Sequence, residues 1–232
     1  MQQKTKALKA AFPLTIPVMT GYLFLGMAFG ILMDSKGYHF GWSILMSIFI
    51  YAGSMQFVAI NLLTVAFNPI NAFFITIMVN ARHLFYGISM LGKFRLTGKI
   101  KPYLIFGLTD ETFSIVCSAE APEGVDRNWF MFFITLLDQI YWVTGAALGG
   151  ILGSVISFNT KGIDFVMTAL FVVIFINQWK SQKNHISAII GVAASVLCLM
   201  LFGQSSFIIP SMILIILVFT AFKNPIERGT EK

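Results

Sequence analysis

The sequence predicts an all-α polytopic membrane protein with seven, alternatively eight, transmembrane helices in a single domain over residues 1–232. Of the 232 residues, 57% are hydrophobic and only 11% are charged, whereas a soluble domain carries about 25% charged residues. No Asp, Glu, Lys or Arg occurs between Lys9 and Asp34, or from Gly37 to Ala81. Since about 20 apolar residues cross the hydrocarbon core, the second gap could hold two spans. This pattern excludes a soluble enzyme, a disordered chain and a coiled coil.

The expected spans follow one another along the whole chain. They are residues 12–33, 42–91, 102–119, 129–158, 163–179, 186–203 and 206–222. Three lysines before the first span and four basic residues at 93–101 place the N-terminus and that loop in the cytoplasm. Residues 42–91 must then cross once in net terms, although they are too long for one span. We therefore expect a broken or re-entrant segment there, near residues 51–56 or near residues 80–86.

A glycine pattern occurs in two of the expected spans. Thr20-Gly21 with Gly26 and Gly30 is similar to Thr144-Gly145 with Gly149, Gly150 and Gly153. With seven crossings the two segments run in opposite directions, as in an inverted repeat, and with eight they run in parallel. Alternatively, both are small-residue faces on which helices pack.

Four ionisable residues fall inside expected spans, at Arg82, Asp110, Glu111 and Asp138. Each costs about 2.5–3.5 kcal/mol at the centre of a span, so we expect them to face the protein interior and to be functional. Arg82 could bind a carboxylate bidentately, or could extend with His83 to the headgroups. Asp110 and Glu111 diverge by about 100° on a helix. Either of them, like Asp138, could carry a proton or pair with Arg82.

Two further segments mix polar residues into apolar surroundings. Residues 51–57 are rich in small and polar side chains, which suits a helix break whose free backbone amides hold a carboxylate. They would equally suit small-residue packing, with Gln56 bridging two helices. In residues 80–87, helical spacing places Asn80 and His83 on one stripe and Arg82 and Tyr86 on another.

Motifs for other chemistries are missing from the sequence. There is no serine-nucleophile turn, aspartyl-protease signature or phosphate-binding glycine loop. Cys117 and Cys198 lie apart in apolar stretches, without the spacing of a metal site or a disulfide framework. We expect neither an enzyme nor a bound cofactor or metal.

Four ordered segments resemble the AzlC family of membrane permeases. They are AFPLTIP at 11–17, IYAGSMQF at 50–57, NARHLFYG at 80–87 and LTDETF at 108–113. The resemblance implies the large subunit of a bacterial branched-chain amino acid exporter in the cell (inner) membrane, with a small hydrophobic AzlD-type partner subunit. It also implies export of leucine, isoleucine and valine, with methionine as a further candidate, by exchange for protons. The alternative is an uncoupled channel or facilitator for a small polar solute.

Combined with this resemblance, the residues suggest a division of roles. Arg82 or the broken backbone at 53–56 would bind the substrate carboxylate, and Phe57 and Tyr86 would line a pocket for its apolar tail. The intramembrane acids would bind the ammonium group or carry a proton. The candidate substrate-binding residues are Tyr51, Gly53, Ser54, Gln56, Phe57, Asn80, Arg82 and Tyr86. The candidate proton-coupling residues are Asp110, Glu111, Asp138 and His83.

Overall fold

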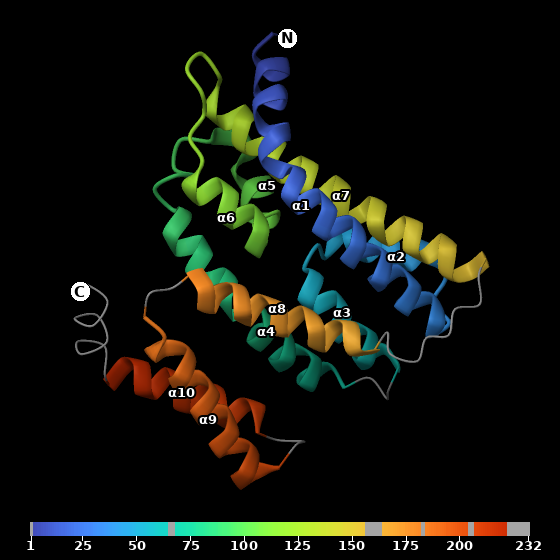
Figure 1. Ribbon diagram of the computed structural model, residues 1–232, viewed down its shortest axis with the longest axis vertical. Helices are drawn as coiled ribbons and strands as arrows, with labels where there is room; N and C mark the ends of the chain where they lie inside the picture. Colours follow the sequence, from blue (N-terminus) through green and yellow to red (C-terminus); the bar gives the residue numbers. More distant parts are fainter. Residues whose placement is uncertain (1, 65–67, 156–163, 182–183, 204–206, 222–232) are drawn as a thin grey trace. The chain divides into compact units, whose positions relative to one another are not determined.

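A computed structural model describes residues 2–64, 68–155, 164–181, 184–203 and 207–221. Every regular element in these described ranges is helical (Figure 1). The elements are α1 (Gln2–Ser35), α2 (Phe40–Phe49), α3 (Gly53–Thr64), α4 (Pro69–Met90), a 3-10 turn (Gly98–Ile100), α5 (Lys101–Phe106), α6 (Asp110–Ser118), α7 (Arg127–Val155), α8 (Asp164–Ser181), α9 (Ile186–Phe202) and α10 (Ile208–Ala221). The chain forms two compact units, Met1–Met167 and Thr168–Lys232. The single domain over residues 1–232 stays a prediction.

The two longest helices, α1 and α7, are each long and apolar enough to cross a membrane. They pack along their lengths in the same direction. Lys4 near the start of α1 lies over the ring of Trp129 near the start of α7, with Nζ 4.1 Å from the ring centroid. Further along both helices, Gly26 lies against the backbone of Ala146. Because later residues of α1 contact later residues of α7, the two helices are parallel.

The inverted repeat suggested by the two glycine patterns is therefore wrong. The segments at 20–30 and 144–153 contact each other as parallel neighbours. A Cβ atom on Gly30 would collide with the backbone at Gly149 and Gly150, so the glycines allow the two helices to approach closely. The alternative interpretation, a small-residue packing face, is what the structure shows.

The first hairpin, α2 with α3, starts beside the C-terminal end of α7. A Cβ atom on Gly150 would touch Phe40, the first residue of α2. At the other end of α2, Gln139 donates from Nε2 to the backbone oxygen of Ile48 at 3.2 Å. The start of α2 thus contacts residue 150 of α7, and its end contacts residue 139. Helix α2 is therefore antiparallel to α7 and runs toward the middle of the unit. There the chain turns at residues 50–52, which we call the first tip.

Helix α3 then returns to the end from which α2 came. Gly53, its first residue, lies against the ring of Trp142 in the middle of α7. Near its last turn, the backbone oxygen of Leu63 accepts a hydrogen bond from the hydroxyl of Tyr38 at 2.9 Å. Tyr38 lies two residues before α2, so both outer ends of the hairpin lie together (Figure 1).

The break expected within residues 42–91 is therefore present at the first tip. The other location considered for it, residues 80–86, lies inside the continuous helix α4. This helix runs from the outer end of the first hairpin to the N-terminal end of α1, where Met90 and Ala7 belong to one buried cluster. Helix α4 is thus antiparallel to α1.

The second hairpin, α5 with α6, enters from the N-terminal end of α1 and turns back at residues 107–109, the second tip. Lys93, which follows α4, donates from Nζ to the backbone oxygens of Val116 at 2.6 Å and Cys117 at 2.8 Å. The end of α6 therefore lies beside the loop that leads into α5. A buried apolar cluster joins α1, α4, α5, α6 and α7 at this end. Its members are Ala7, Ala11, Met90, Phe94, Leu104, Leu108, Val116, Phe130, Met131 and Ile134.

The membrane-crossing span expected at residues 102–119 is wrong, because the chain turns back halfway. A Cβ atom on Gly107 would collide with Thr135 of α7, so the turn fits only a small residue. Thr109 then caps α6 by accepting a hydrogen bond from the backbone N–H of Thr112 at 3.3 Å. Two short helices in a row have the length and hydropathy of one span, which is why the sequence suggested a crossing. The total number of crossings stays a prediction.

An inverted repeat is present between α1–α3 and α4–α6, which are not the segments expected from the sequence. Helices α1, α2 and α3 form a long helix followed by a hairpin, and α4, α5 and α6 repeat that order. Since α4 is antiparallel to α1, the two hairpins enter from opposite ends and their tips meet inside the unit. This is the arrangement of an inverted repeat.

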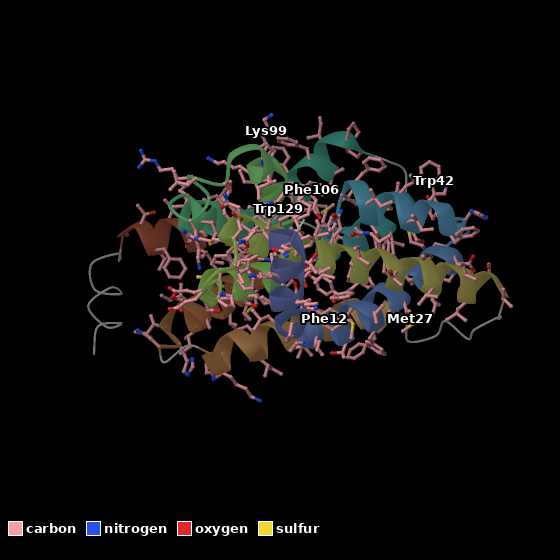
Figure 2. The ribbon with its side chains drawn as sticks, turned by 90° about the horizontal axis from the view of Figure 1, so that it is seen from above. Phe12, Met27, Trp42, Lys99, Phe106 and Trp129 are labelled. Carbon is pink, nitrogen blue, oxygen red and sulfur yellow. The ribbon has the colours of Figure 1, made fainter. Side chains whose placement is uncertain are left out.

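The surface of this unit exposes many large apolar side chains. Phe12, Trp42 and Phe106 are among them, with 45%, 57% and 43% of their surface accessible (Figure 2). Exposed apolar area on this scale is unusual for a soluble protein. It is the arrangement required where lipid or another apolar chain covers the surface.

The second unit contains α9, α10 and most of α8. Helix α9 buries Ala194 and Cys198. Trp179 near the end of α8 stacks on His185 with ring centroids 4.1 Å apart. None of the candidate site residues lies in this unit, so the site is built from the first unit alone.

Candidate functional site

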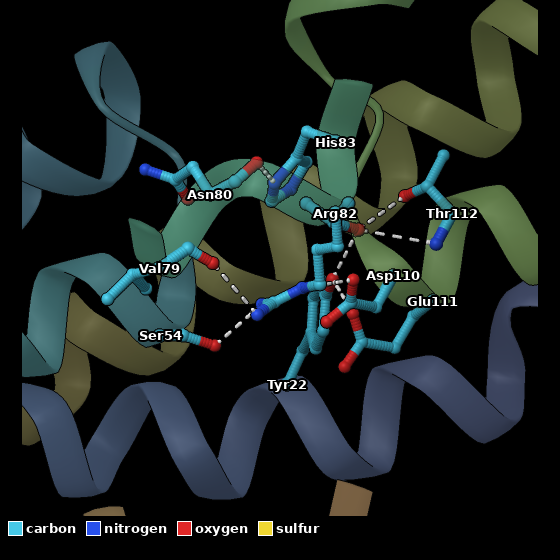
Figure 3. A network of polar contacts seen from close by, with 10 residues as sticks. Tyr22, Ser54, Val79, Asn80, Arg82, His83, Asp110, Glu111 and Thr112 are labelled. Carbon is cyan, nitrogen blue, oxygen red and sulfur yellow. Dashed lines mark hydrogen bonds and ion pairs between the residues drawn. The ribbon is translucent and has the colours of Figure 1, made fainter. Parts of the chain in front are cut away.

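Arg82 of α4 connects the tips of the two hairpins (Figure 3). Its Nε donates to Oδ1 of Asp110 at 2.7 Å, forming an ion pair with the second hairpin. Its Nη2 donates to Oγ of Ser54, in the first turn of α3, at 2.9 Å. A third bond, from Nη1 to the backbone oxygen of Val79 at 3.1 Å, orients the side chain. The guanidinium is therefore held by partners within the first unit.

Each tip is followed by the N-terminus of a helix. In α3 the first intrahelical acceptor is the backbone oxygen of Ala52, which binds the N–H of Gln56 at 2.8 Å. The amides of residues 53–55 precede that bond and have no acceptor within their own helix. In α6 the first turn carries Asp110 and Glu111, which the positive end of the helix dipole stabilises. One tip thus offers donors and the other offers carboxylates.

A second group of polar contacts runs from Glu111 to Asp138. Tyr22 of α1 donates its hydroxyl hydrogen to Oε2 of Glu111 at 2.7 Å, and the hydroxyl oxygen of Tyr22 lies 2.6 Å from Oγ1 of Thr109. Thr109 donates to Oγ1 of Thr112 at 3.0 Å, and Thr112 donates to Oδ2 of Asp138 at 2.8 Å. These four contacts link α1, α6 and α7 without a gap.

Two buried oxygens near this group lack a hydrogen-bond partner among the described residues. They are Oδ1 of Asp138 and the hydroxyl of Tyr51. Asp138 is fully buried, and Tyr51 is 3% exposed. The backbone of Tyr51 is also unusual, because its φ of 44° is one that residues other than glycine rarely adopt. Buried oxygens without partners and backbone strain are both typical of functional sites.

Other candidates from the first hairpin lie in packing positions. Gln56 donates from Nε2 to Oγ of Ser47 at 3.2 Å and accepts from Nε1 of Trp142 at 2.9 Å. It bridges α2, α3 and α7, which agrees with the packing interpretation of this segment. Phe57 is buried against Phe29, with ring centroids 5.6 Å apart in an edge-to-face contact. The structure does not bring Phe57 into a pocket with Tyr86.

Asn80, His83 and Tyr86 lie on α4 next to Arg82. Nδ1 of His83 is 3.2 Å from the backbone oxygen of Asn80. Tyr86 stacks on Phe113 of α6, with ring centroids 4.4 Å apart. Asn80 and His83 also contribute to an open pocket of about 530 Å³ between α4, the first tip and α5. Most of its wall is apolar, including Ile50, Ala52, Leu84, Phe106 and Leu108.

Three of the polar residues at the site were not singled out from the sequence. Tyr22, Thr109 and Thr112 each supply a hydroxyl group to the contacts between Glu111 and Asp138. A signal was present for two of them, since a Thr before two acids and a second Thr is the pattern of a helix N-cap. Tyr22 lies in an apolar helix, where the sequence gives no sign of what its hydroxyl contacts.

Comparison with known proteins assigns the family. Residues 17–156 match the family described as AzlC protein. The chain is 59% identical over 223 residues to a branched-chain amino acid transport protein, AzlC, of Bacillus subtilis, covering 96% of this chain and 88% of the relative. It is 46% identical to an uncharacterized membrane protein of Haemophilus influenzae, covering 98% and 93% of the two chains. It is 26% identical to the inner membrane protein YgaZ of Escherichia coli, over 78% of each chain.

No solved structure matches the chain. The relatives confirm the predictions of a membrane protein and of a chain that is not an enzyme. The matched residues 17–156 include both hairpins and all the candidate site residues. The protein belongs to the AzlC family.

Proposed function

We propose that this protein exports branched-chain amino acids in exchange for protons, with its substrate site between the two hairpin tips. The name of the relative at 59% identity supports the substrate class. The observation that carries the location is the position of Arg82, bound to Ser54 at one tip and to Asp110 at the other. Side chains held between two re-entrant hairpins can bind a solute at mid-membrane depth.

The substrate has three parts that need separate partners. A branched-chain amino acid carries a carboxylate, an ammonium group and an apolar tail. Arg82 and the free amides at the start of α3 suit the carboxylate, and Asp110 suits the ammonium group. A zwitterion that enters between Arg82 and Asp110 replaces one internal ion pair by two pairs with the substrate. Because no net charge is added, binding of the zwitterion avoids the cost of an unpaired ion.

The apolar pocket beside the first tip suits the tail of the substrate. It borders Tyr51 and Leu108, one residue from each tip region, and its wall is mostly apolar. Burial of a Val or Leu side chain contributes about 1.5–3 kcal/mol. We assign the tail to this pocket and not to Phe57, which the first hairpin packs against α1.

The charge of the substrate supports the proposed coupling to protons. The zwitterion has no net charge, so the membrane potential alone does not drive it outward. Entry of one proton contributes about 2.3 kcal/mol per 100 mV of potential. That energy corresponds to a concentration ratio of about fifty. Glu111 and Asp138 are the proposed proton carriers, since Asp110 is occupied by Arg82.

A small hydrophobic subunit of the AzlD type is the proposed partner. Ile70, Phe73 and Ile77 share one face of α4, outside the substrate pocket, and expose 70%, 60% and 47% of their surface. An apolar chain in the membrane could cover such a stripe. Co-expression with an AzlD-type subunit should yield a complex that survives purification and transports valine faster than the single chain.

Transport assays in proteoliposomes test the proposal. Purified protein should show saturable valine efflux that is stimulated by valine on the opposite side and driven by a pH gradient. Asp110→Asn should abolish efflux, whereas the matched control Asp126→Asn should not. Asp126 caps α7 in an exposed loop by accepting from the N–H of Trp129, and Asn caps equally well. Flux without saturation or stimulation would instead indicate a channel.

A further inference from the structure

We propose that Tyr22, Thr109 and Thr112 form a hydroxyl relay that carries a proton between Glu111 and Asp138. This inference rests on the proposed proton coupling and specifies its route. Each step of the relay joins two oxygens within hydrogen-bond distance, from 2.6 to 3.0 Å apart. Distances of this kind are within the normal range for O–H···O bonds, along which protons transfer.

The two ends of the relay differ in their access to water. Glu111 is half-buried beside the second tip, whereas Asp138 is fully buried in the middle of α7. Thr112 is the described residue that donates to Asp138, through Oδ2. A proton that reaches Asp138 without movement of the helices must therefore pass through Thr112. Glu111 is the point of entry from the substrate site.

Each of the three hydroxyl groups in the relay can accept one proton and donate another. When Glu111 is protonated, it donates to the hydroxyl of Tyr22, which donates to Thr109. Thr109 then donates to Thr112, and Thr112 donates to Asp138, in the orientation that the last two bonds already have. Each oxygen loses one proton and gains one. The net result is transfer of one proton from Glu111 to the Asp138 carboxylate, and all three hydroxyls remain neutral.

The lack of a hydrogen-bond partner at Oδ1 of Asp138 supports a role in proton transfer over a purely structural one. An ionised carboxylate normally accepts several hydrogen bonds when it is buried. Here Oδ2 accepts one and Oδ1 has no partner among the described residues. A cycle in which Asp138 gains and loses a proton explains why the site leaves this oxygen free.

Several other titratable groups face the relay from neighbouring elements. They are Asp110 of α6, Arg82 of α4, Tyr51 of the first tip and Tyr103 of α5. Arg82 and Asp110 neutralise each other in their ion pair. Tyr103 is bound to Gln139 at 2.7 Å. Asp110, Arg82 and Tyr103 lie outside the path from Glu111 to Asp138, and Tyr51 interacts with Thr112 beside that path.

The test removes one hydroxyl group from the relay and keeps its shape. Thr112→Val and the matched control Thr112→Ser are reconstituted as full-length proteins. Two assays are run, valine exchange without a pH gradient and valine accumulation driven by a pH gradient. We expect Thr112→Val to retain exchange while the initial rate of gradient-driven accumulation falls by about a hundredfold. Thr112→Ser should retain both activities.

A second variant breaks the relay on a different helix. Tyr22→Phe removes the hydroxyl group between Glu111 and Thr109, and should give the same selective loss. If both variants accumulate valine like the wild type, the relay is wrong although proton coupling stands. If the pH gradient drives no valine accumulation in the wild type, both the proposed coupling and the relay are wrong.

Time-resolved infrared difference spectroscopy measures the rate at which Asp138 gains its proton, which a purely structural role of Thr112 would not set. The carbonyl band of protonated Asp138 is assigned by its loss in Asp138→Asn. After a pH jump, this band should appear at similar rates in the wild type and in Thr112→Ser, and far more slowly in Thr112→Val. An unchanged rate in Thr112→Val would overturn the relay. Loss of exchange in both Thr112 variants would assign Thr112 to packing and overturn it as well.

Discussion

Arg82 and Asp110 are joined by an ion pair of 2.7 Å that fixes the second tip to α4. The same guanidinium group donates to Ser54 of the first hairpin at 2.9 Å. Any motion that separates the two tips must therefore break a bond to Arg82. A substrate that takes over one of these bonds would loosen the contact between the hairpins, which links binding to movement.

Replacement of Arg82 by Lys should test this double contact. A lysine keeps the charge, but its single ammonium group cannot reproduce the planar fork that holds two partners. Loss of one charge-assisted hydrogen bond costs about 1.5–3 kcal/mol. Valine transport by Arg82→Lys should accordingly fall by about ten- to a hundredfold, measured as initial efflux from proteoliposomes. Transport at the wild-type rate would show that charge alone is sufficient.

The stability of the pair gives an independent prediction. Arg82→Ala and Asp110→Ala each leave one ion without its partner, and each should lower the stability by about 1–3 kcal/mol. The expected loss is moderate because the two side chains keep 27% and 22% of their surface exposed. The double variant should be more stable than either single variant and still inactive. Additive losses in thermal unfolding would show that the two residues do not interact.

The second hairpin predicts a topology that cysteine labelling can measure. If residues 101–118 enter and leave at one end, Lys99→Cys and Glu123→Cys should react with an impermeant reagent from the same side of sealed vesicles. Ser35→Cys, at the far end of α1, should react from the opposite side. The background should carry Ala in place of Cys117 and Cys198. Reaction of positions 99 and 123 from opposite sides would restore a crossing between them.

The sequence predicted one hairpin and missed the other for a physical reason. Residues 51–57 concentrate small and polar side chains, and the length of residues 42–91 conflicted with the charge of the loops. Both signals required a break there. At residues 102–119 the length fitted one span, so Gly107 was the main sign of a turn. Its role depends on Thr135, a distant residue that the local pattern cannot reveal.

The site shows the same limit on prediction. Arg82 and Asp110 stood out because ionised groups are costly in a membrane, and pairing between them was one of the alternatives. The hydroxyl groups of Tyr22, Thr109 and Thr112 add little free-energy cost to a membrane helix, so they do not stand out in the sequence. Their importance comes from distances between α1, α6 and α7, which only the fold specifies.

Gln56 and Trp142 form a buried hydrogen bond whose removal should destabilise the protein. Gln56→Leu leaves the indole N–H of Trp142 without its acceptor, and an unsatisfied buried donor costs about 1–3 kcal/mol. Trp142→Phe should be damaging as well, since Gln56 then loses its donor. We expect the double variant to lose less than the sum of the two single losses. Thermal unfolding in detergent measures all three, and strictly additive losses would contradict a direct interaction.

The parallel contact between α1 and α7 should depend on the glycines that face it. Gly149→Ala would place a Cβ atom against the backbone of Met27, which cannot move aside as a flexible side chain would. Overpacking of this kind costs about 1–3 kcal/mol, so the melting temperature in detergent should fall. Gly21→Ala is the matched control, because a Cβ there meets nothing within 4 Å, and it should leave the melting temperature unchanged or slightly higher. Equal losses for both variants would show that helix flexibility, and not close approach, explains the glycines. An unchanged melting temperature for Gly149→Ala would contradict the packing of α1 on α7 itself.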